Sequence, residues 1–194
     1  NNILGGQDLY VQVVTRGEKL GFYPFPGNLK LQAGTISYMS SSQQNTYYTG
    51  IKALLSKNWN KLNITYGVDI DFEKFDANQS VYNLEKTMSS GGLINTTQYE
   101  LGRYPTNNSR SYAGYAQVKY DILPKLQLNA GVRYQRINVE VDDFVGATQQ
   151  VQVAMGYGKS ASAIPRGKSD YNMTLANAEL LYKINEQNQL WGTF

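Results

Sequence analysis

Three carboxylates occupy alternate positions in one segment of the chain: Asp69, Asp71 and Glu73. If this segment is a β-strand, alternate residues share a face and the three side chains project to the same side. Carboxylates grouped in this way can act as general acids and bases or bind hard metal ions. They can also pair with basic side chains on the same surface, for which the candidates are Lys52, Lys119 and Arg133. The choice depends on the elements that carry them.

Composition excludes several other kinds of chemistry. The chain contains neither Cys nor His, which removes disulfides, thiolate nucleophiles, His-containing triads and His-ligated zinc. The Gly-rich segment 156–160 (GYGKS) includes a Lys-Ser pair but lacks the spacing of a phosphate-binding loop. The formal net charge of +3 is small and there is no stripe of Lys and Arg, so nucleic acid is not an expected partner.

The three carboxylates belong to a segment with two-residue periodicity. Its alternate positions are apolar: Leu62, Ile64, Tyr66, Val68, Ile70 and Phe72. This period predicts a strand, here 62–75, with one apolar and one polar face. The sequence predicts further strands at about 8–15, 47–57, 111–122, from 126 onward, 171–184 and 189–194. Beyond Tyr134 the apolar residues change phase, to Ile137, Val139 and Val141, which predicts a β-bulge near residues 135–136.

The connections between these strands alternate between short and long. Short turns are expected at 58–61, 123–125 and 185–188, whereas polar stretches occupy about 16–46, 76–110 and 142–170. The first stretch contains two close prolines, which disfavour a central strand, and a short extra strand at 29–38; a turn is expected over residues 1–7. This alternation is typical of transmembrane β-barrels, whose short turns face the periplasm and whose long loops face outside. No apolar run approaches the ~18 residues of a membrane helix.

We therefore predict an all-β fold, an antiparallel up-and-down transmembrane β-barrel fragment of about seven strands. Seven strands are too few to close such a barrel, and the chain begins at Asn1 without Met. Residues 1–194 are thus expected to be a partial barrel domain of a longer protein. In a barrel the carboxylates line the lumen and pair with basic residues.

The same fold assigns roles to the apolar and aromatic residues. Those expected to face lipid include Leu62, Ile64, Val68, Leu128, Ala130, Val132, Ala178 and Leu180. Aromatic residues beside the short turns are expected to form a girdle at the membrane interface: Trp59, Tyr120, Tyr182 and Trp191.

Two hairpins resemble those of TonB-dependent outer-membrane receptors. One joins 115–120 (YAQVKY) through the turn LPK to 126–134 (LQLNAGVRY), and the other joins 180–184 (LLYKI) to 189–194 (QLWGTF). Segments 23–26 (YPFP) and 102–105 (GRYP) are similar to loops of receptors for ferric hydroxamate–citrate siderophores of the aerobactin type. The resemblance implies a barrel of about 22 strands in the bacterial outer membrane, plugged by an N-terminal domain that contacts TonB. Neither the plug nor its TonB-binding segment is in this sequence.

The resemblance implies a transport receptor and not an enzyme. Such a receptor binds a ferric siderophore outside the cell and imports it with energy supplied through TonB. Iron is then part of the ligand, no cofactor or resident metal is expected, and outer-membrane lipid and lipopolysaccharide are further partners. Ferric chelates of the citrate type are anionic, so cations and aromatic rings of the outer loops are candidate ligand-binding residues. They are Arg103, Tyr104, Arg110, Tyr112, Tyr157, Lys159, Arg166 and Lys168. Contact with lipopolysaccharide phosphates, or simple solvation, is the alternative role of the cations.

Two other classes of protein stay open. One is a different outer-membrane barrel, either a porin or a barrel enzyme such as a lipase or protease, whose His-containing site would lie outside this sequence. The other is a soluble all-β binding module, whose connections would be more even in length. The alternation of long and short connections favours a membrane barrel.

Overall fold

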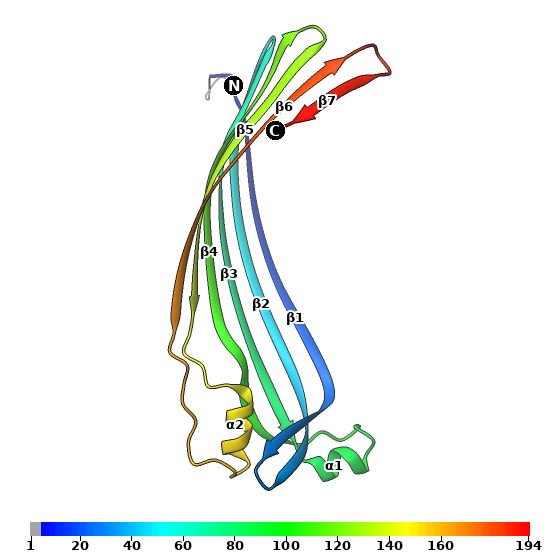
Figure 1. Ribbon diagram of the computed structural model, residues 1–194, viewed down its shortest axis with the longest axis vertical. Coiled ribbons are helices and arrows are strands. Elements are labelled where there is room, and N and C mark those ends of the chain that lie inside the picture. Colours follow the sequence, from blue (N-terminus) through cyan, green and yellow to red (C-terminus); the bar gives the residue numbers. More distant parts are fainter. Residues whose placement is uncertain (1–4) are drawn as a thin grey trace.

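The computed structural model describes residues 5–194, which form one antiparallel sheet with two short helices. The strands are β1 (Asp8–Leu31), β2 (Gly34–Trp59), β3 (Leu62–Tyr82), β4 (Thr97–Leu123), β5 (Leu126–Val141), β6 (Gly167–Lys183) and β7 (Gln189–Thr193). The helices α1 (Leu84–Ser89) and α2 (Ala147–Ala154) lie in two of the long connections. Each strand pairs with its neighbours in the sequence, and the sheet curves into an open trough (Figure 1). The predicted all-β, up-and-down barrel wall is confirmed.

Neither helix in residues 5–194 is long and apolar enough to cross a membrane.

The three predicted short turns are confirmed. Trp59 pairs with Leu62, Leu123 with Leu126, and Lys183 with Gln189. All three turns lie at one end of the sheet, and both helices lie at the other end, the loop end (Figure 1). Of the turn predicted over residues 1–7, residues 1–4 lie outside the described part of the chain, and Gly5 and Gly6 adopt positive φ angles of 63° and 73°.

The strands extend much further toward the loop end than predicted. The expectation of an irregular region over 16–46 is wrong, because β1 and β2 form one long hairpin that closes where Leu31 pairs with Gly34. Pro24 lies within, and Pro26 just beyond, a register shift between Phe22 and Phe25, where the interrupted ladder tolerates residues without a backbone N–H. Likewise, the polar stretch 76–110 contains the end of β3, helix α1 and the start of β4. The apolar residues of the strands form a band across the middle of the sheet. Where a strand extends beyond this band, its residues need not alternate between apolar and polar, so the two-residue periodicity that predicts a strand is absent from the sequence.

Cross-strand register gathers the apolar residues on one face of the sheet. Residues directly opposite each other in antiparallel strands share a face, and Ile70 pairs with Ile51 on one side and with Tyr112 on the other. All residues predicted to face lipid lie on this face: Leu62, Ile64, Val68, Leu128, Ala130, Val132, Ala178 and Leu180. The opposite face carries the carboxylates. We call the first the outer face and the second the inner face.

The predicted bulge near residues 135–136 is wrong. Strand β5 pairs with β4 and β6 without a register shift from Gln127 to Val141. The change of phase instead reflects an exchange of polarity between the two faces. Toward the loop end the inner face becomes apolar, with Ile137, Val139 and Val141, and the outer face becomes polar, with Arg136, Asn138 and Glu140. The change therefore marks the level at which β5 leaves the apolar band.

The register also corrects one member of the predicted aromatic girdle. Tyr120 pairs with Leu62 and Tyr182 pairs with Leu126, which places both on the outer face together with Trp59. Trp191 pairs with Leu181 and lies on the inner face. The prediction for Trp191 is therefore wrong.

Val132 tests the assignment of the two faces. Its side chain is half exposed on the outer face, one alternate position from the middle of the apolar stretch of β5. Changing Val132→Arg in the full-length protein should lower the free energy of unfolding from lipid vesicles by about 2 kcal/mol, because the charge enters the bilayer. Asn129→Arg, on the inner face of the same strand, is the matched control and should change it by less than about 0.5 kcal/mol. The reverse order would mean that the faces are inverted.

Candidate functional site

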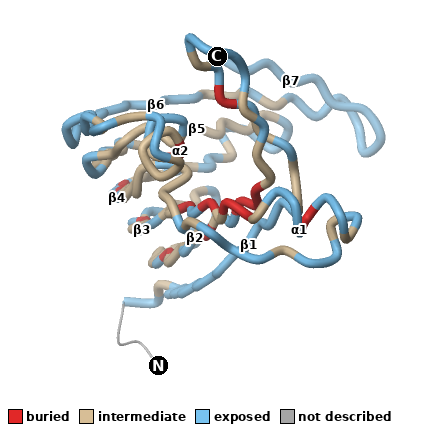
Figure 2. The backbone as a smooth tube through the Cα atoms, turned by 90° about the horizontal axis from the view of Figure 1, so that it is seen from below, coloured by how far each residue is buried: buried red, intermediate tan, exposed pale blue. Residues whose placement is uncertain are grey.

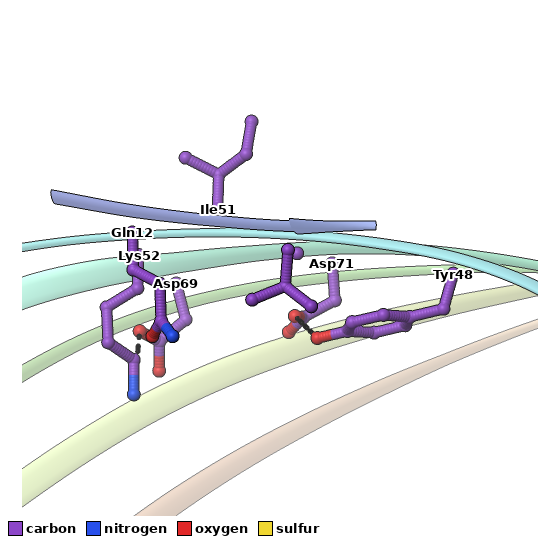
Figure 3. Close-up of a pocket in the computed structure, with 8 residues that line it drawn as sticks. Gln12, Tyr48, Ile51, Lys52, Asp69 and Asp71 are labelled. Carbon is purple, nitrogen blue, oxygen red and sulfur yellow. Dashed lines mark hydrogen bonds and ion pairs between the residues drawn. The ribbon is translucent and has the colours of Figure 1, made fainter. Parts of the chain in front are cut away.

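A charged cluster occupies the middle of the inner face. One Asp69 carboxylate oxygen lies 2.6 Å from Arg133 Nη1, and the other lies 3.8 Å from Lys52 Nζ. Figure 3 shows Asp69 and Lys52 on one side of the sheet and Ile51 pointing to the other. Arg133 reaches Asp69 across β4, which lies between their strands. Two of the three predicted basic partners are thus confirmed, and Asp69 has an ion-pairing role.

Asp71 is held by a different partner. The Tyr48 hydroxyl donates a hydrogen bond of 2.5 Å to Asp71 (Figure 3). Gly50 makes this contact possible, since a Cβ there would overlap the Tyr48 ring and lie 3.0 Å from the Asp71 carboxylate. Asp69 and Asp71 therefore have partners, and their geometry favours ordering of the wall over catalysis. Glu73, the third predicted carboxylate, is exposed on the same face opposite Tyr48.

The most deeply buried side chains lie at the loop end. They come from β1, β2, β3 and both helices: Leu29, Ser40, Gln79, Val81, Thr87 and Val151. Figure 2 shows buried segments where these elements meet, while the central strands of the sheet are largely intermediate and the outer strands largely exposed. The long connections thus fold back onto the strand ends and form the one compact core of residues 5–194.

Arg103 projects into this region from a bulge. Gly102 pairs with Asn78 and Tyr104 pairs with Ala77, so Arg103 has no partner on β3. Such an extra residue re-aims a side chain. Arg103 Nη1 donates a hydrogen bond of 3.2 Å to Gln79 Oε1. Gln79 pairs with Ser42, which shares the inner face with Lys52, so Arg103 points to the inner face.

Two aromatic rings flank the Arg103 guanidinium. Its central carbon lies 5.8 Å from the centroid of the Phe25 ring and 5.3 Å from that of Tyr104. These are cation–π distances. Phe25 pairs with Ser40 on the inner face. We refer to Arg103, Tyr104, Phe25 and Gln79 as the mouth cluster.

Buried donors without partners adjoin the mouth cluster. Ser40 Oγ, Ser42 Oγ and Gln79 Nε2 have no hydrogen-bond partner among residues 5–194. Their residues are 0%, 3% and 1% exposed. Each of the three groups can donate, so together with Arg103 they suit an acceptor such as a carboxylate.

Helix α2 is fastened to the free edge of β4. Strand β5 ends at Val141, opposite Asn107, which leaves the first part of β4 without a partner on that side. Gln150 takes this place: its Oε1 accepts from Gly102 N at 3.0 Å, and its Nε2 donates to Gly102 O at 3.2 Å and to Val145 O at 2.5 Å. A Cβ on Gly102 would lie 3.0 Å from the Phe144 ring. We call this contact the Gln150 latch.

The structure divides the predicted ligand-binding residues among several places. Arg103 and Tyr104 belong to the mouth cluster. Arg110 pairs with Phe72, and Tyr112 pairs with Ile70, so both lie within β4 on the outer face. Arg110 is therefore not in an outer loop as predicted, and Tyr112, which falls in the predicted strand 111–122, points away from the inner face. Tyr157, Lys159 and Arg166 are exposed in the connection from α2 to β6. Lys168 lies in β6 and forms an ion pair of 3.6 Å with Glu140.

Sequence reasoning missed two members of the mouth cluster. Phe25 lies in the YPFP segment that carried a resemblance, so that segment held a usable signal. Gln79 lies in a stretch that reads as polar loop, and nothing in the sequence distinguishes it from its neighbours.

Residues 6–194 match the protein family described as TonB dependent receptor-like, beta-barrel. The chain belongs to this family of outer-membrane receptors. It is 44% identical over 191 residues to the ferric aerobactin receptor of Klebsiella pneumoniae, covering 97% of this chain and 26% of that protein. It is 38% identical over 195 residues to the rhizobactin receptor of Rhizobium meliloti (strain 1021), covering 100% of this chain and 26% of that protein. The chain thus spans about a quarter of the length of these relatives.

A solved structure supports the fold. The copper transporter OprC superimposes with a TM-score of 0.69 over 99% of this chain and 29% of its own. At 11% sequence identity this likeness concerns the fold alone.

The Gln150 latch predicts how the outer connection responds to mutation. Gln150→Ala in the full-length receptor removes three hydrogen bonds, each worth about 0.5–1.5 kcal/mol. We expect amide exchange in α2 to accelerate at least tenfold, while heat-modifiable migration of the barrel on gels is unchanged. Gln149→Ala, at an exposed position of α2, is the control and should leave exchange as it is. Equal protection in both variants would show that the latch does not hold the helix.

Proposed function

We propose that this chain forms part of the wall and outer mouth of a receptor that takes up an anionic ferric siderophore of the aerobactin type. The observation that carries the proposal is the 44% identity with a ferric aerobactin receptor across 97% of this chain, the long connections included. Loops of a barrel diverge more readily than its wall, so an alignment at this overall identity that spans the long connections supports a shared ligand class. The energy for import would come from TonB through a plug domain outside this chain.

The mouth cluster supports the same ligand class. A ferric chelate with free carboxylates needs cations at its site, and Arg offers a planar pair of donors. Arg103 is held by Gln79 and flanked by two rings, so its guanidinium is oriented before a ligand arrives. The adjacent unpartnered donors of Ser40, Ser42 and Gln79 are costly when buried, and an anionic acceptor would relieve that cost.

Uptake of this kind requires no covalent change in the substrate. The receptor binds the chelate on its outer side and releases it on the inner side, so no nucleophile or general base is needed. The ion pairs of Asp69 agree with this role, since they fix the wall and leave no free carboxylate at that position. We therefore propose a transporter and not an outer-membrane enzyme.

Arg103 provides the direct test. In the full-length receptor, Arg103→Ala should weaken binding of ferric aerobactin by about 2–5 kcal/mol, at least about 30-fold, because it removes a charged partner from a partly desolvated site. Binding can be measured by quenching of intrinsic fluorescence in detergent, and uptake with radioactive iron in cells that lack other siderophore receptors. Arg103→Lys should recover only part of the affinity.

Arg110→Ala is the matched control, since it removes the same side chain from the outer face of the same strand. Its affinity for ferric aerobactin should stay within about twofold of the unmodified receptor. If Arg103→Ala and Arg110→Ala changed the affinity for ferric aerobactin equally, the mouth cluster would not be the ligand-binding site. No binding of ferric aerobactin by the unmodified receptor would overturn the ligand class.

A further inference from the structure

Four apolar side chains are exposed in the connection between β3 and β4. Leu84 and Met88 share one face of helix α1, and Leu93 and Ile94 follow the helix. The exposed fractions of the four residues are 38%, 64%, 89% and 59% in chain order. Apolar residues that gather at an exposed site mark an interaction surface, whereas single ones need no explanation. We call Met88, Leu93 and Ile94, the three most exposed, the apolar tip.

Hydrogen bonds fix the shape of this connection before any partner arrives. Asn83 N donates to Thr96 O at 2.9 Å and closes the connection at its base. Ser90 Oγ accepts from Ile94 N at 2.9 Å, which brings Ile94 back to the end of α1. Gly92 has a positive φ of 85°, a conformation that glycine adopts without strain. The apolar tip is therefore held in contact with water, an unfavourable arrangement that a bound apolar group would relieve.

The apolar tip adjoins the mouth cluster. A Cβ on Gly92 would lie 3.5 Å from Pro24 Cγ, and Pro24 precedes Phe25, one of the two rings that flank Arg103. Figure 1 and Figure 2 both place α1 on the concave side of the sheet, which is the inner side of a barrel wall. An apolar surface and a site for an anion thus lie side by side at the mouth of the lumen.

The residue types of the apolar tip define what it can bind. Leu, Ile and Met side chains have no hydrogen-bond donor, so they cannot recognise the carboxylates or hydroxamates of a chelate. Their flexible aliphatic groups suit a chain of methylene groups. Full burial of each methylene group strengthens binding by up to about fourfold.

We propose that the apolar tip binds a fatty acyl chain of the transported chelate. The ligand is then amphiphilic: its carboxylates meet Arg103, and its acyl chain lies on Met88, Leu93 and Ile94. This inference rests on the proposed function and adds an acyl-chain subsite to it. Another outer connection of the barrel is the alternative occupant of the apolar tip, and the experiment separates the two.

The test compares two chelates on variants of the full-length receptor. The chelates are ferric aerobactin and an analogue in which one hydroxamate carries an octanoyl group. The triple variant carries Met88→Ser, Leu93→Ser and Ile94→Ser, and Leu93→Ser is also made alone. Ile164→Ser is the matched control for Leu93→Ser, since it removes an exposed aliphatic side chain from the connection between α2 and β6. Affinities are measured by fluorescence quenching in detergent, where micelles take up the octanoyl chain equally for every protein, and heat-modifiable migration verifies folding.

The unmodified receptor and the Ile164→Ser control should bind the octanoyl chelate about tenfold more tightly than ferric aerobactin. Leu93→Ser should reduce this preference by about threefold. The triple variant should show a preference below about twofold, while its affinity for ferric aerobactin stays within about twofold of that of the unmodified receptor. Arg103→Ala should weaken binding of both chelates by the same factor, because it acts on their carboxylates.

The inference is overturned if the unmodified receptor binds ferric aerobactin but gains nothing from the octanoyl group, a result that leaves the proposed function intact. It is also overturned if the folded triple variant, or Leu93→Ser where the triple variant fails to fold, keeps the full preference. Equal loss of affinity for both chelates in the triple variant would show that the apolar tip packs against another outer connection. Failure of the unmodified receptor to bind either chelate would overturn the proposed function and this inference together.

Discussion

A strand that crosses a membrane has to pair all its backbone donors and acceptors with neighbouring strands, because the bilayer offers no water to replace them. This constraint shapes the whole chain. Antiparallel pairing between strands that are neighbours in the sequence satisfies this requirement with the shortest connections. The order of strands in the sheet therefore follows the sequence from β1 to β7. Continuous pairing then leaves only the two faces of the sheet free to vary. The outer face is apolar over the band, and the inner face carries the ion pairs of Asp69 with Lys52 and Arg133.

The candidate ligand-binding residues lie at the loop end, where the requirement for continuous strand pairing ends. Beyond the band, water can satisfy the backbone, and the ladder tolerates interruptions. The bulge at Arg103 and the free edge of β4 are two such interruptions. At the first interruption, the Arg103 guanidinium turns inward between the rings of Phe25 and Tyr104. At the second, Gln150 hydrogen-bonds to the edge of β4 where a neighbouring strand would otherwise pair, and so holds α2 against it.

The sequence predicts the part of the fold that crosses the bilayer. Alternating residues such as Leu62 to Phe72 identify the crossing strands, and the short turns after Trp59, Leu123 and Lys183 follow from them. It does not predict the strand extensions, because segments such as 40–45 and 107–109 carry Ser, Asn and Gln on both faces. Where both faces of a strand contact water, both carry polar residues and the sequence shows no two-residue periodicity. For the same reason the exchange of polarity after Tyr134 was indistinguishable from a bulge.

The candidate site was predictable only in residue type. Charge and aromatic character point to Arg103 and Tyr104, but they point equally to Arg110 and Tyr112. Only the register shows that the second pair lies on the outer face. Simple alternation along the chain separates inward from outward positions only where no bulge intervenes, and a register shift lies between Arg103 and Arg110. The partners that orient Arg103 come from β1 and β3, at distances along the chain that no local pattern reveals.

The central claim is that one face of this sheet meets lipid and the other meets water. It can be measured along β3, since this part of the receptor has no native Cys. Single Cys substitutions at successive positions from 62 to 72, each carrying a nitroxide label in the full-length receptor in lipid vesicles, report accessibility to oxygen and to a water-soluble nickel complex. The account predicts period two, with oxygen collisions highest at positions such as Ile64, Val68 and Phe72. High nickel accessibility at those positions, or no alternation, would contradict it.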